Sequence, residues 1–289
     1  MRPERKREAV FFEAIPFRNK KLSPLNDSNK TAWEKRSKLF GASLKGVLFK
    51  GVPDVVNEHV HDWHQKVILH AMGGKGELRI LDAGCGYGRL SLPIIHKFPN
   101  LDIVGLDISE TYVTLYKKNT NHPAWIGAIE NIPKELGTFD FILCVTVLMY
   151  LDPDQLNQGI SNLLFHLKQN GKLILIEPHF SGHYFQTGFG LLTFFMKRVQ
   201  KDTVDTQGRY FRSKEIEQLF KHAGGQVLFK WRLPITSLFF GPLTLAGKLL
   251  PDGVVKPFCK FISFLDALLG KLELPSIQVA YLIARNEKG

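Results

Sequence analysis

The sequence predicts a doubly wound α/β fold with a mostly parallel sheet, and three observations support this prediction. Apolar runs of strand length alternate with segments of helical periodicity from residue 77 to residue 178. These runs, such as ELRILDAG and FDFILCVTV, are apolar without regular alternation, which is typical of strands buried on both faces. Short turns join the runs to the helical segments, so helices are expected to cover both sides of the sheet.

Each element follows from local signals along the chain. Two helices are expected first, over 31–46 and 54–72, because apolar residues recur at helical spacing in the second. Ser109 and Ser213 are the expected N-caps of two later helices. Strands are predicted at 77–84, 101–108, 124–128, 139–147, 171–178, 226–233 and 276–286. Further helices are predicted at 88–98, 109–119, 152–169 and 213–225.

The chain has 289 residues, of which 44% are apolar, and it is long enough for one large domain with additions. We expect a basic, irregular arm over 1–30, a helical extension over 31–74 and the main domain over 75–289. Residues 179–212 and 233–278 are aromatic or punctuated by proline, so they are expected to form cap segments over a substrate.

Positive charge is concentrated near the N-terminus. The formal net charge is +11, and the first fifty residues hold thirteen lysines and arginines against five acids. Such a segment can attract nucleic acid or anionic lipid, and it can equally be a solvated tail, so both interpretations stay open. Three cysteines without disulfide spacing, no signal peptide and no apolar span of about 18 residues together predict a cytoplasmic protein with reduced thiols.

The most specific signal is LDAGCGYGRL, in which Gly84, Gly86 and Gly88 follow an apolar run directly. A P-loop is excluded, because no Lys-Ser or Lys-Thr pair comes after these glycines. A dinucleotide fingerprint is excluded as well, because its third glycine would stand at Arg89. The loop is therefore expected to approach a different kind of nucleoside ligand.

Two acidic residues frame this loop. Asp107 ends the next predicted strand, where a carboxylate can accept hydrogen bonds from both hydroxyls of a ribose. Asp82 ends the strand before the loop, where a carboxylate would repel phosphate and would suit a positive end such as the ammonium of a methionine moiety. These residues predict a nucleoside ligand with a cationic tail.

With these residues the chain resembles the class I S-adenosylmethionine-dependent methyltransferases of the small-molecule type. LDAGCGYGR resembles their first motif and VGLDIS the second, and GAIENIPKELGTFDFILCVTVLMYL and LKQNGKLILIEP follow in the family's order. The resemblance covers roughly residues 75–180 and implies a seven-stranded sheet whose final strand is inserted antiparallel. It also implies S-adenosylmethionine as the cofactor and methyl transfer as the activity.

The resemblance implies a cofactor site residue by residue. Asp82 and the glycine loop would hold the methionine part, and Ile108 would pack on the adenine. Ala128 and Ile129 stand where many members carry an acid and a small residue at the adenine edge, and the carbonyl of Cys144 would take the amino end. The implied cofactor-binding residues are Asp82, Gly84, Cys85, Gly86, Gly88, Asp107, Ile108, Ala128, Ile129 and Cys144.

The acceptor is expected to be a small molecule, because no Asn/Asp-Pro-Pro-aromatic motif of nucleic-acid amino methyltransferases follows the fourth strand. DNA is therefore excluded as a partner and RNA is disfavoured. A hydroxyl acceptor needs a general base, and His179 and Tyr150 are the candidates at the carboxyl end of the sheet. His64, His183 and Tyr184 are predicted to contact the substrate. Four histidines of the second predicted helix could bind a metal, but no complementary cluster accompanies them and no metal is predicted.

Residues 233–278 form a long apolar insertion before the last predicted strand. Its second half is predicted to be an amphipathic helix whose apolar stripe consists of Phe258, Ile262, Leu265 and Leu269. Such a segment is expected to cap a lipid-like acceptor methylated at oxygen or carbon, with peripheral contact at the inner face of a membrane. Two alternatives stay open, an RNA methyltransferase that uses the basic arm and a non-catalytic module that binds only the cofactor. The oligomeric state has no signal in the sequence.

Overall fold

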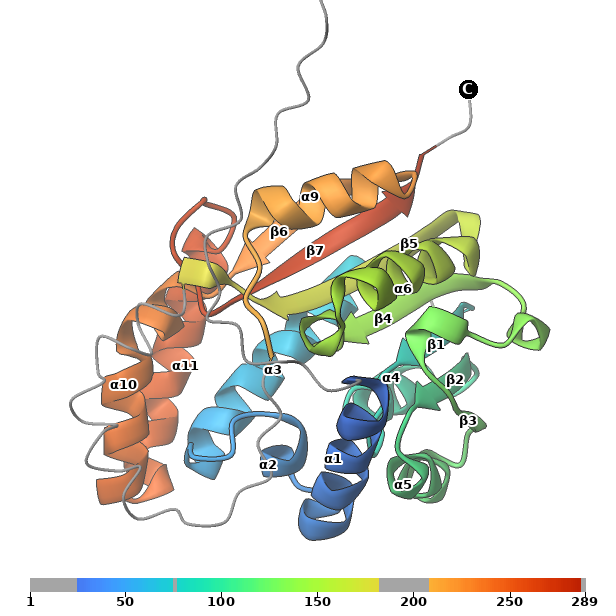
Figure 1. Cartoon of the computed structure of the whole chain (residues 1–289). Helices are drawn as coiled ribbons and strands as arrows, with labels where there is room; N and C mark the ends of the chain where they lie inside the picture. The colour runs from blue at the N-terminus through green and yellow to red at the C-terminus, as the bar shows by residue number, and fades with distance from the viewer. Residues whose placement is uncertain (1–24, 75–76, 182–207, 287–289) are drawn as a thin grey trace, which may run out of the picture.

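The computed structural model describes residues 25–74, 77–181 and 208–286, and within them the expected α/β architecture is confirmed. One seven-stranded sheet runs through the molecule with helices on both faces (Figure 1). Its strands are β1 (Arg79–Ala83), β2 (Asp102–Asp107), β3 (Ala124–Ile126), β4 (Phe139–Val145), β5 (Leu167–Pro178), β6 (Gly225–Arg232) and β7 (Gln278–Arg285). The helices are α1 (Leu25–Phe40), α2 (Leu44–Val47), α3 (Asp54–Ala71), α4 (Ser91–Lys97), α5 (Glu110–Thr120), α6 (Pro153–Phe165), α9 (Ser213–His222), α10 (Pro234–Leu249) and α11 (Asp252–Leu269).

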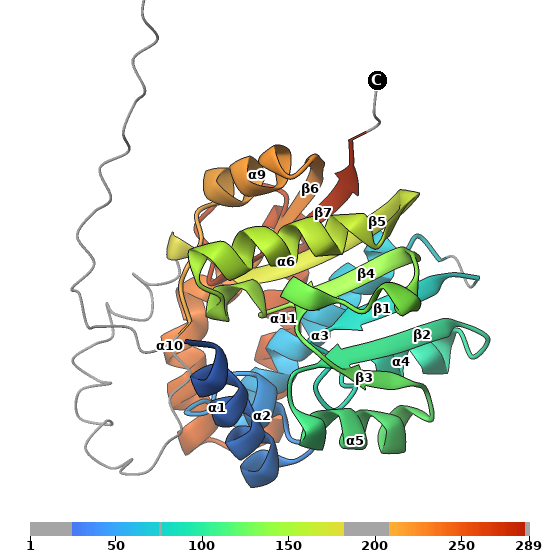
Figure 2. The ribbon, with the colours of Figure 1, turned by 45° about the vertical axis from the view of Figure 1, so that its right-hand side comes forward.

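The strand order is β3-β2-β1-β4-β5-β7-β6, and Figure 2 shows β5, β4, β1, β2 and β3 in this sequence from top to bottom. β1 to β5 are parallel, whereas β7 is antiparallel to both of its neighbours, which confirms the expected antiparallel insertion. The chain proceeds from β1 to β3 on one side and then continues from β4 on the other. Open α/β sheets bind ligands outside the carboxyl ends of their strands at such a reversal of order.

The two faces of the sheet carry separate hydrophobic cores. Ile80 and Phe141 face the core that the sheet shares with α3, α4, α10 and α11. Leu81 and Ile142, one position further along the same strands, face the core shared with α6 and α9. Successive strand residues are thus buried on opposite faces, and this explains why the strands are apolar without alternation.

The N-terminal helices begin earlier and break sooner than predicted. The expected irregular arm over 1–30 is corrected at its end, because residues 25–30 already belong to α1. The single helix expected over 31–46 is two helices, since Gly41 adopts a left-handed φ of +52° and ends α1. Ser43 then caps the short α2 by accepting a hydrogen bond from the backbone of Lys45.

Two further helix boundaries differ from the prediction, and one is confirmed. The helix expected over 152–169 ends at Phe165, because Leu167 already pairs with β4 in the sheet. Ser213 is the first residue of α9 rather than its N-cap, and its hydroxyl is engaged with other side chains. Ser109 is confirmed as the N-cap of α5, since its side chain accepts a hydrogen bond from the backbone of Tyr112.

The insertion over 233–278 folds into a helical hairpin, α10 and α11, that packs on α3. The predicted apolar stripe of α11 is corrected: Ile262 is buried, but Phe258 is exposed and the other two members are half-buried. The error arises because both faces of α11 are apolar, so periodicity alone could not show which one packs inward. The residues of α11 that face the core are Val255, Cys259, Ile262 and Asp266. In the part of the chain that the structure describes, no helix is long and apolar enough to cross a membrane.

Candidate functional site

A cavity of about 390 Å³ opens at the carboxyl ends of β1, β2 and β4, where the order of the strands reverses. Its volume lies in the range of small-molecule sites in proteins. The glycine loop after β1, the end of β2, the loop after β3 and the loop after β4 form its walls, and α1 lies across its mouth. We call it the first cavity.

The glycine loop brings the protein backbone to the surface of the first cavity. Gly84 and Gly86 line it with φ of +82° and +52°, which side-chain-bearing residues rarely adopt. A Cβ atom on Gly84 would overlap the side chain of Val147 on the facing loop. Cys85 also lines the cavity, and its backbone N–H donates to the carbonyl of Leu106 over 3.0 Å. The loop is therefore held to β2 by its own backbone.

Gly88 does not line the cavity, which corrects its expected contact with the cofactor. Its φ is +89°, and a Cβ atom there would collide with Thr120 and crowd Tyr116 of α5. The third glycine of the motif is thus needed for the close approach of α5 to the loop.

Asp107 lines the first cavity from the end of β2. Its carboxylate accepts one hydrogen bond from the backbone N–H of Gly86 and another from that of Ser109, each 2.9 Å long. Burial raises the pKa of Asp107 to about 6 although both hydrogen bonds favour the charged form. The group is therefore ionised at neutral pH and can accept hydrogen bonds from ligand hydroxyls.

Asp82 is buried beneath the loop and does not line the cavity, which corrects its expected contact with the positive end of a ligand. Its carboxylate accepts a hydrogen bond from the Ser91 hydroxyl over 2.7 Å, and Tyr116 in turn donates to that hydroxyl. Burial raises the pKa of Asp82 to about 6. The residue thus orders the start of α4 behind the glycine loop.

Arg89 is a buried cation in the wall of the first cavity. In the sequence it was noted only because it stands where a dinucleotide fingerprint has its third glycine. Its guanidinium donates to Nδ1 of His61 over 3.1 Å and to Nδ1 of His64 over 3.2 Å. Because arginine can only donate, both Nδ1 atoms are acceptors, and burial lowers the pKa of both histidines. These neutral rings hold Arg89 without cancelling its charge.

His64 is consequently a support for Arg89 rather than a residue of the substrate pocket, which corrects its predicted role. It is fully buried, and its Nε2 donates to the side-chain oxygen of Gln278 on β7 over 2.8 Å. It has no surface in the first cavity. The histidine-rich helix thus faces the cation from behind, and no group of three metal-ligating side chains occurs among the described residues.

Ile108, Ala128 and Ile129 line the first cavity, and their contact with the adenine stays a prediction. Glu130 lines the same cavity, and burial raises the pKa of its carboxyl. Sequence reasoning missed Glu130, because the family motif has its acid two positions earlier, where this chain has Ala128. Its position in the same loop was the signal that could have found it.

Cys144 is fully buried within β4 and is not among the lining residues, so the expected contact of its backbone carbonyl stays a prediction. The next three residues of the chain, Val145, Thr146 and Val147, line the cavity. Thr146 has a φ of +57°, an unusual conformation for a β-branched residue, and its neighbour Val147 donates its backbone N–H to Glu177. The loop after β4 therefore turns sharply into the cavity.

Glu177, at the end of β5, fixes the shape of this loop. Its Oε1 accepts the backbone N–H groups of Val147 and Leu148 over 3.0 and 2.8 Å. The side chain is fully buried, and burial raises its pKa to about 8. Glu177 thereby determines where the following residues, including Tyr150, meet the cavity.

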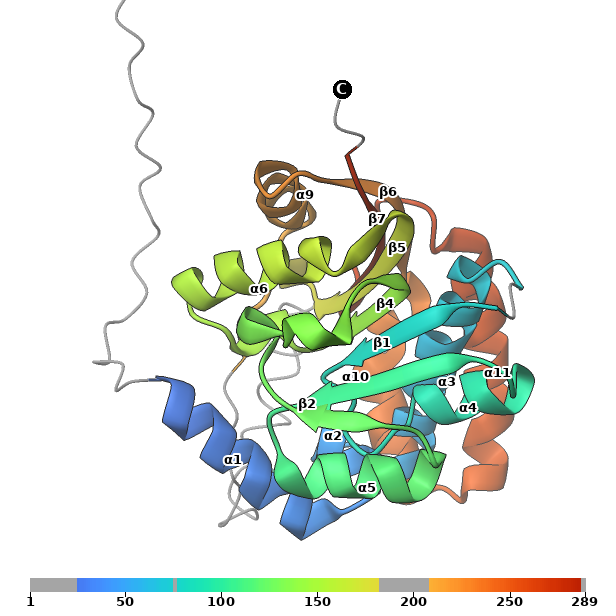
Figure 3. The ribbon, with the colours of Figure 1, turned by 90° about the vertical axis from the view of Figure 1, so that its right-hand side faces the viewer.

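Helix α1 lies over the mouth of the first cavity, next to α5 and beyond the tip of β2 (Figure 3). Asn29 donates its side-chain amide to the carbonyl of Tyr150 over 2.8 Å, and the ring of Trp33 meets that of Tyr150 edge-on at 5.2 Å. Burial acts to raise the pKa of Glu34, but hydrogen bonds from Thr111 and Ser109 outweigh it and lower the pKa to about 2. Sequence reasoning missed this wall because these residues are distant in the chain from every motif.

A second cavity of about 280 Å³ adjoins the first, and Val47, Thr146 and Tyr150 line both. Its walls come from the segment after α2, the loop after β4, residues 208–210 and the start of β7. Arg36 and Lys50 are the cationic side chains of its lining, and no carboxylate occurs among the described lining residues. The residues that line it are Arg36, Val47, Leu48, Phe49, Lys50, Thr146, Met149, Tyr150, Pro178, Gly208, Tyr210, Ile277 and Gln278.

His179 lines neither cavity, although it follows β5 as expected. Its Nδ1 lies 2.7 Å from the Ser181 hydroxyl and its Nε2 lies 3.3 Å from that of Ser213. Burial lowers its pKa to about 4. This placement corrects its predicted position beside the acceptor. His183 and Tyr184, the other predicted substrate contacts, lie outside the described residues.

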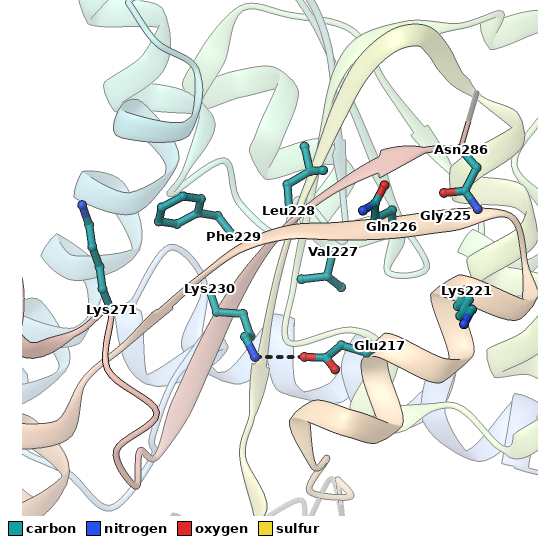
Figure 4. Close-up of a pocket in the computed structure, with 10 residues that line it drawn as sticks. All are labelled: Glu217, Lys221, Gly225, Gln226, Val227, Leu228, Phe229, Lys230, Lys271 and Asn286. Carbon is teal, nitrogen blue, oxygen red and sulfur yellow. Dashed lines mark hydrogen bonds and ion pairs between the residues drawn. The ribbon is translucent and has the colours of Figure 1, made fainter.

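A third, shallower groove of about 590 Å³ lies along the edge strand β6 and α9 (Figure 4). Phe229, Lys230 and Glu217 are among its lining residues, and Lys230 is paired with Glu217 at 2.9 Å. None of the predicted site residues lines it, and it is built on the opposite edge of the sheet from β3. The first two cavities are therefore the candidate functional site.

Comparison with known protein families agrees with this location. Residues 80–171, which hold the glycine loop, Asp107 and the loop after β4, match the family model of a methyltransferase domain. The chain is also similar to the magnesium protoporphyrin IX methyltransferase of Synechocystis, solved with bound S-adenosylhomocysteine. That structure has a TM-score of 0.51 at 15% identity, and the similarity covers 91% of this chain and 96% of that one. This likeness concerns the fold.

Curated relatives include proteins with different acceptors. The chain is 25% identical over 199 residues to the mouse tRNA N(3)-cytidine methyltransferase METTL2, which covers 60% of this chain and 51% of that protein. It is 24% identical over 161 residues to the ubiquinone biosynthesis O-methyltransferase of Rickettsia akari, which covers 54% of this chain and 61% of that protein. The chain thus spans between half and two thirds of the length of these relatives.

Proposed function

We propose that this protein, which belongs to the class I S-adenosylmethionine-dependent methyltransferases, transfers a methyl group to a small apolar acceptor at oxygen or carbon. Its cofactor is S-adenosylmethionine. The observation that carries the proposal is the second cavity, which shares Tyr150 and Thr146 with the first and is walled largely by apolar side chains. An acceptor held there would meet the cofactor at this shared wall.

The residues of the first cavity fit the cofactor in shape and charge. The ionised carboxylate of Asp107 would accept hydrogen bonds from the ribose hydroxyls. Arg89 would pair with the carboxylate of the methionine part, and the apolar side chains of Ile108 and Ile129 would enclose the adenine. When bound, S-adenosylmethionine supplies an activated methyl group on a positively charged sulfur.

The protein's own part in such a transfer is mainly alignment and exclusion of water. Glu177 holds the loop after β4, and this loop places Tyr150 between the two cavities. Trp33 packs on the ring of Tyr150 and restricts its orientation. The phenolic oxygen can accept a hydrogen bond from an acceptor hydroxyl and orient it, so we propose Tyr150, rather than His179, as the residue that positions the acceptor.

The charges of the second cavity point to an acceptor that carries an acidic group beside its apolar body. Arg36 is one cation of the cavity lining, and it donates two hydrogen bonds to the backbone carbonyls of Lys45 and Leu48. Lys50 adds a second cation to the same lining. An anionic, lipid-like molecule satisfies both features, and the proposal therefore includes peripheral contact with a membrane, where such acceptors reside.

The test offers the purified protein S-adenosylmethionine labelled on its methyl group together with three separate acceptor pools. These pools are a lipid extract, an aqueous metabolite extract and total tRNA. We expect the label in the lipid extract, and within it in an acidic fraction retained by an anion exchanger. Label in the tRNA would overturn the proposal in favour of an RNA acceptor, which the tRNA-modifying relatives make the relevant competitor.

A matched pair of variants makes the assay specific. Asp107→Asn should strongly reduce labelling in every pool, because it removes the charged acceptor in the cofactor cavity. Asp102→Asn changes an exposed residue at the start of the same strand, so labelling should persist. Cofactor binding by calorimetry without label in any pool would support a non-catalytic module instead.

A further inference from the structure

The helical hairpin presents an apolar surface to solvent. Leu238, Leu245 and Leu249 recur on one side of α10, and they are 54%, 43% and 72% exposed. Phe261, Phe264 and Leu268 recur in the same way on α11, at 56%, 60% and 61%. We call these six residues the outer face. Monomeric soluble proteins rarely expose large apolar side chains in contiguous rows, so such a surface indicates a binding partner.

The outer face is not required for packing the hairpin. The opposite sides of both helices carry the buried residues, among them Phe240 and Leu243 of α10 and Ile262 of α11. Both helices pack on each other and on α3, and they lie side by side at the margin of the molecule (Figure 1). Since both helices turn their inner sides to the same helix, their outer stripes point away from it together.

The inner side of the hairpin reaches the wall of the second cavity. The ring of Phe240 meets that of Phe49 edge-on at 5.1 Å, and Phe49 lines the cavity. The hairpin is therefore a layer with the acceptor cavity behind one side and exposed apolar side chains on the other.

Two lysines accompany the outer face, Lys248 in the last turn of α10 and Lys260 on α11. Two more lie near the hairpin, but Lys256 is paired with Glu58 of α3 at 3.1 Å and Lys271 lies over the ring of Phe229 on β6. On the two helices these cations are accompanied by one exposed acid, Asp252, while Asp266 is buried against the start of α10. Apolar side chains flanked by lysines match a bilayer with anionic headgroups, which attract the cations and admit the leucine and phenylalanine side chains.

We propose that the outer face of α10 and α11 is a docking surface for an anionic lipid membrane. The hairpin lies on the membrane without spanning it, because among the described residues no helix is long and apolar enough to cross. Docking would bring the acceptor cavity close to the bilayer. This link to the acceptor rests on the proposed function, whereas membrane binding itself does not.

The experiment measures co-sedimentation of the full chain with large vesicles. One set contains phosphatidylcholine with an equal part of phosphatidylglycerol, and the other contains phosphatidylcholine alone. We expect binding to the anionic vesicles that weakens as salt is added, and at least about tenfold weaker binding to the neutral ones. Cofactor is left out, so a failure of methyl transfer cannot affect the result.

Matched variants assign the binding to the outer face. Phe261→Ser combined with Phe264→Ser should weaken partitioning into the vesicles at least about tenfold, because the membrane contact loses two exposed rings that would insert into the bilayer. Phe165→Ser is the control, since Phe165 is 57% exposed on α6, which packs on the other face of the sheet. Lys248→Gln with Lys260→Gln should reduce the salt dependence, whereas the exposed pair Lys117→Gln with Lys118→Gln on α5 should not.

A fluorophore on Phe264→Cys separates the membrane from other occupants. The three native cysteines are buried, so the label is selective. A polarity-sensitive emission that shifts to the blue only when anionic vesicles are added supports the proposal. Emission that is already shifted to the blue without vesicles overturns the proposal, because something else then covers the outer face. Sedimentation velocity identifies the cover: a second copy if the protein is a dimer, and the chain itself if it is a monomer. Vesicle binding unchanged by the double serine variant also overturns the proposal.

Discussion

The two adjoining cavities are assembled in different ways. The first is built largely from turns that directly follow strands of the sheet, and its distinctive groups are backbone atoms, the carboxylate of Asp107 and the buried cation Arg89. The second collects side chains from residues 36–50, 146–150, 208–210 and 277–278. A cavity of the first kind depends on backbone geometry, whereas one of the second kind depends on which distant segments happen to meet. The first should therefore tolerate few changes in its loops, and the second should be altered by single side chains.

The largest expected effect falls on the wall that the cavities share. Tyr150→Phe keeps the ring that packs on Trp33 but removes the hydroxyl, so turnover should fall about a hundredfold with cofactor affinity unchanged. Steady-state kinetics with calorimetry separates the two quantities. His179→Gln should leave turnover unchanged, because His179 lines neither cavity. A large loss in the His179 variant with none in Tyr150→Phe would restore the histidine as the base.

The next effect tests the first cavity alone. Asp107→Ala removes the acceptor of two backbone hydrogen bonds and of the ribose, so cofactor binding should weaken by ~2 kcal/mol, or about thirtyfold. Isothermal calorimetry measures this change directly. Asp102→Ala, at the exposed start of the same strand, serves as the control. Equal affinities in the two variants would show that the cofactor does not contact Asp107.

A smaller effect measures how strictly the loop backbone is constrained. Gly84 and Gly224 have nearly equal φ of +82° and +84°, but only at Gly84 would a Cβ atom meet a neighbour. Gly224→Ala should cost ~1 kcal/mol of unfolding free energy from conformation alone, and Gly84→Ala ~1–2 kcal/mol more from overlap with Val147. Chemical denaturation gives both values. Adding Val147→Ala should recover most of the excess, and a failure to recover it would assign the cost to the loop itself.

The smallest effect is a pH dependence of cofactor binding. Asp107 has a pKa raised to about 6 and accepts ligand hydroxyls as the charged form, so affinity is nearly full about one unit above that pKa and falls as protons compete at lower pH. Affinity at pH 5 should be about tenfold weaker than at pH 7. Asp107→Asn should remove this dependence. Its persistence in that variant would assign the titration to Asp82, whose pKa is also raised to about 6.

The first cavity was largely predictable because its residues follow strand ends in sequence. Gly84, Gly86 and Asp107 are placed by the local pattern of strand, turn and helix, which the parallel sheet converts into one location. The exceptions are informative. The side chains of Asp82 and Cys144 belong to the same motifs but are buried, because a motif does not show to which face a strand residue turns its side chain.

The second cavity could not be predicted in this way. Arg36 lies on α1, and its approach to the loop after β4 depends on how that helix docks over the sheet. His64 was predicted to contact the substrate, yet Arg89 and Gln278 engage it in the interior. Partners from three distant elements carry no common signal in the sequence.

The sequence by itself determined the alternation of strands and helices, the glycine loop and the carboxylate at the end of β2, because local propensity and short spacings encode them. Only the tertiary structure decided which histidines are buried behind Arg89, which residue stands between the cavities, and which side of α11 faces solvent. The physical reason is the same in each case. Burial and charge compensation depend on neighbours that are distant in the chain, and both sides of α11 are apolar enough to have packed inward.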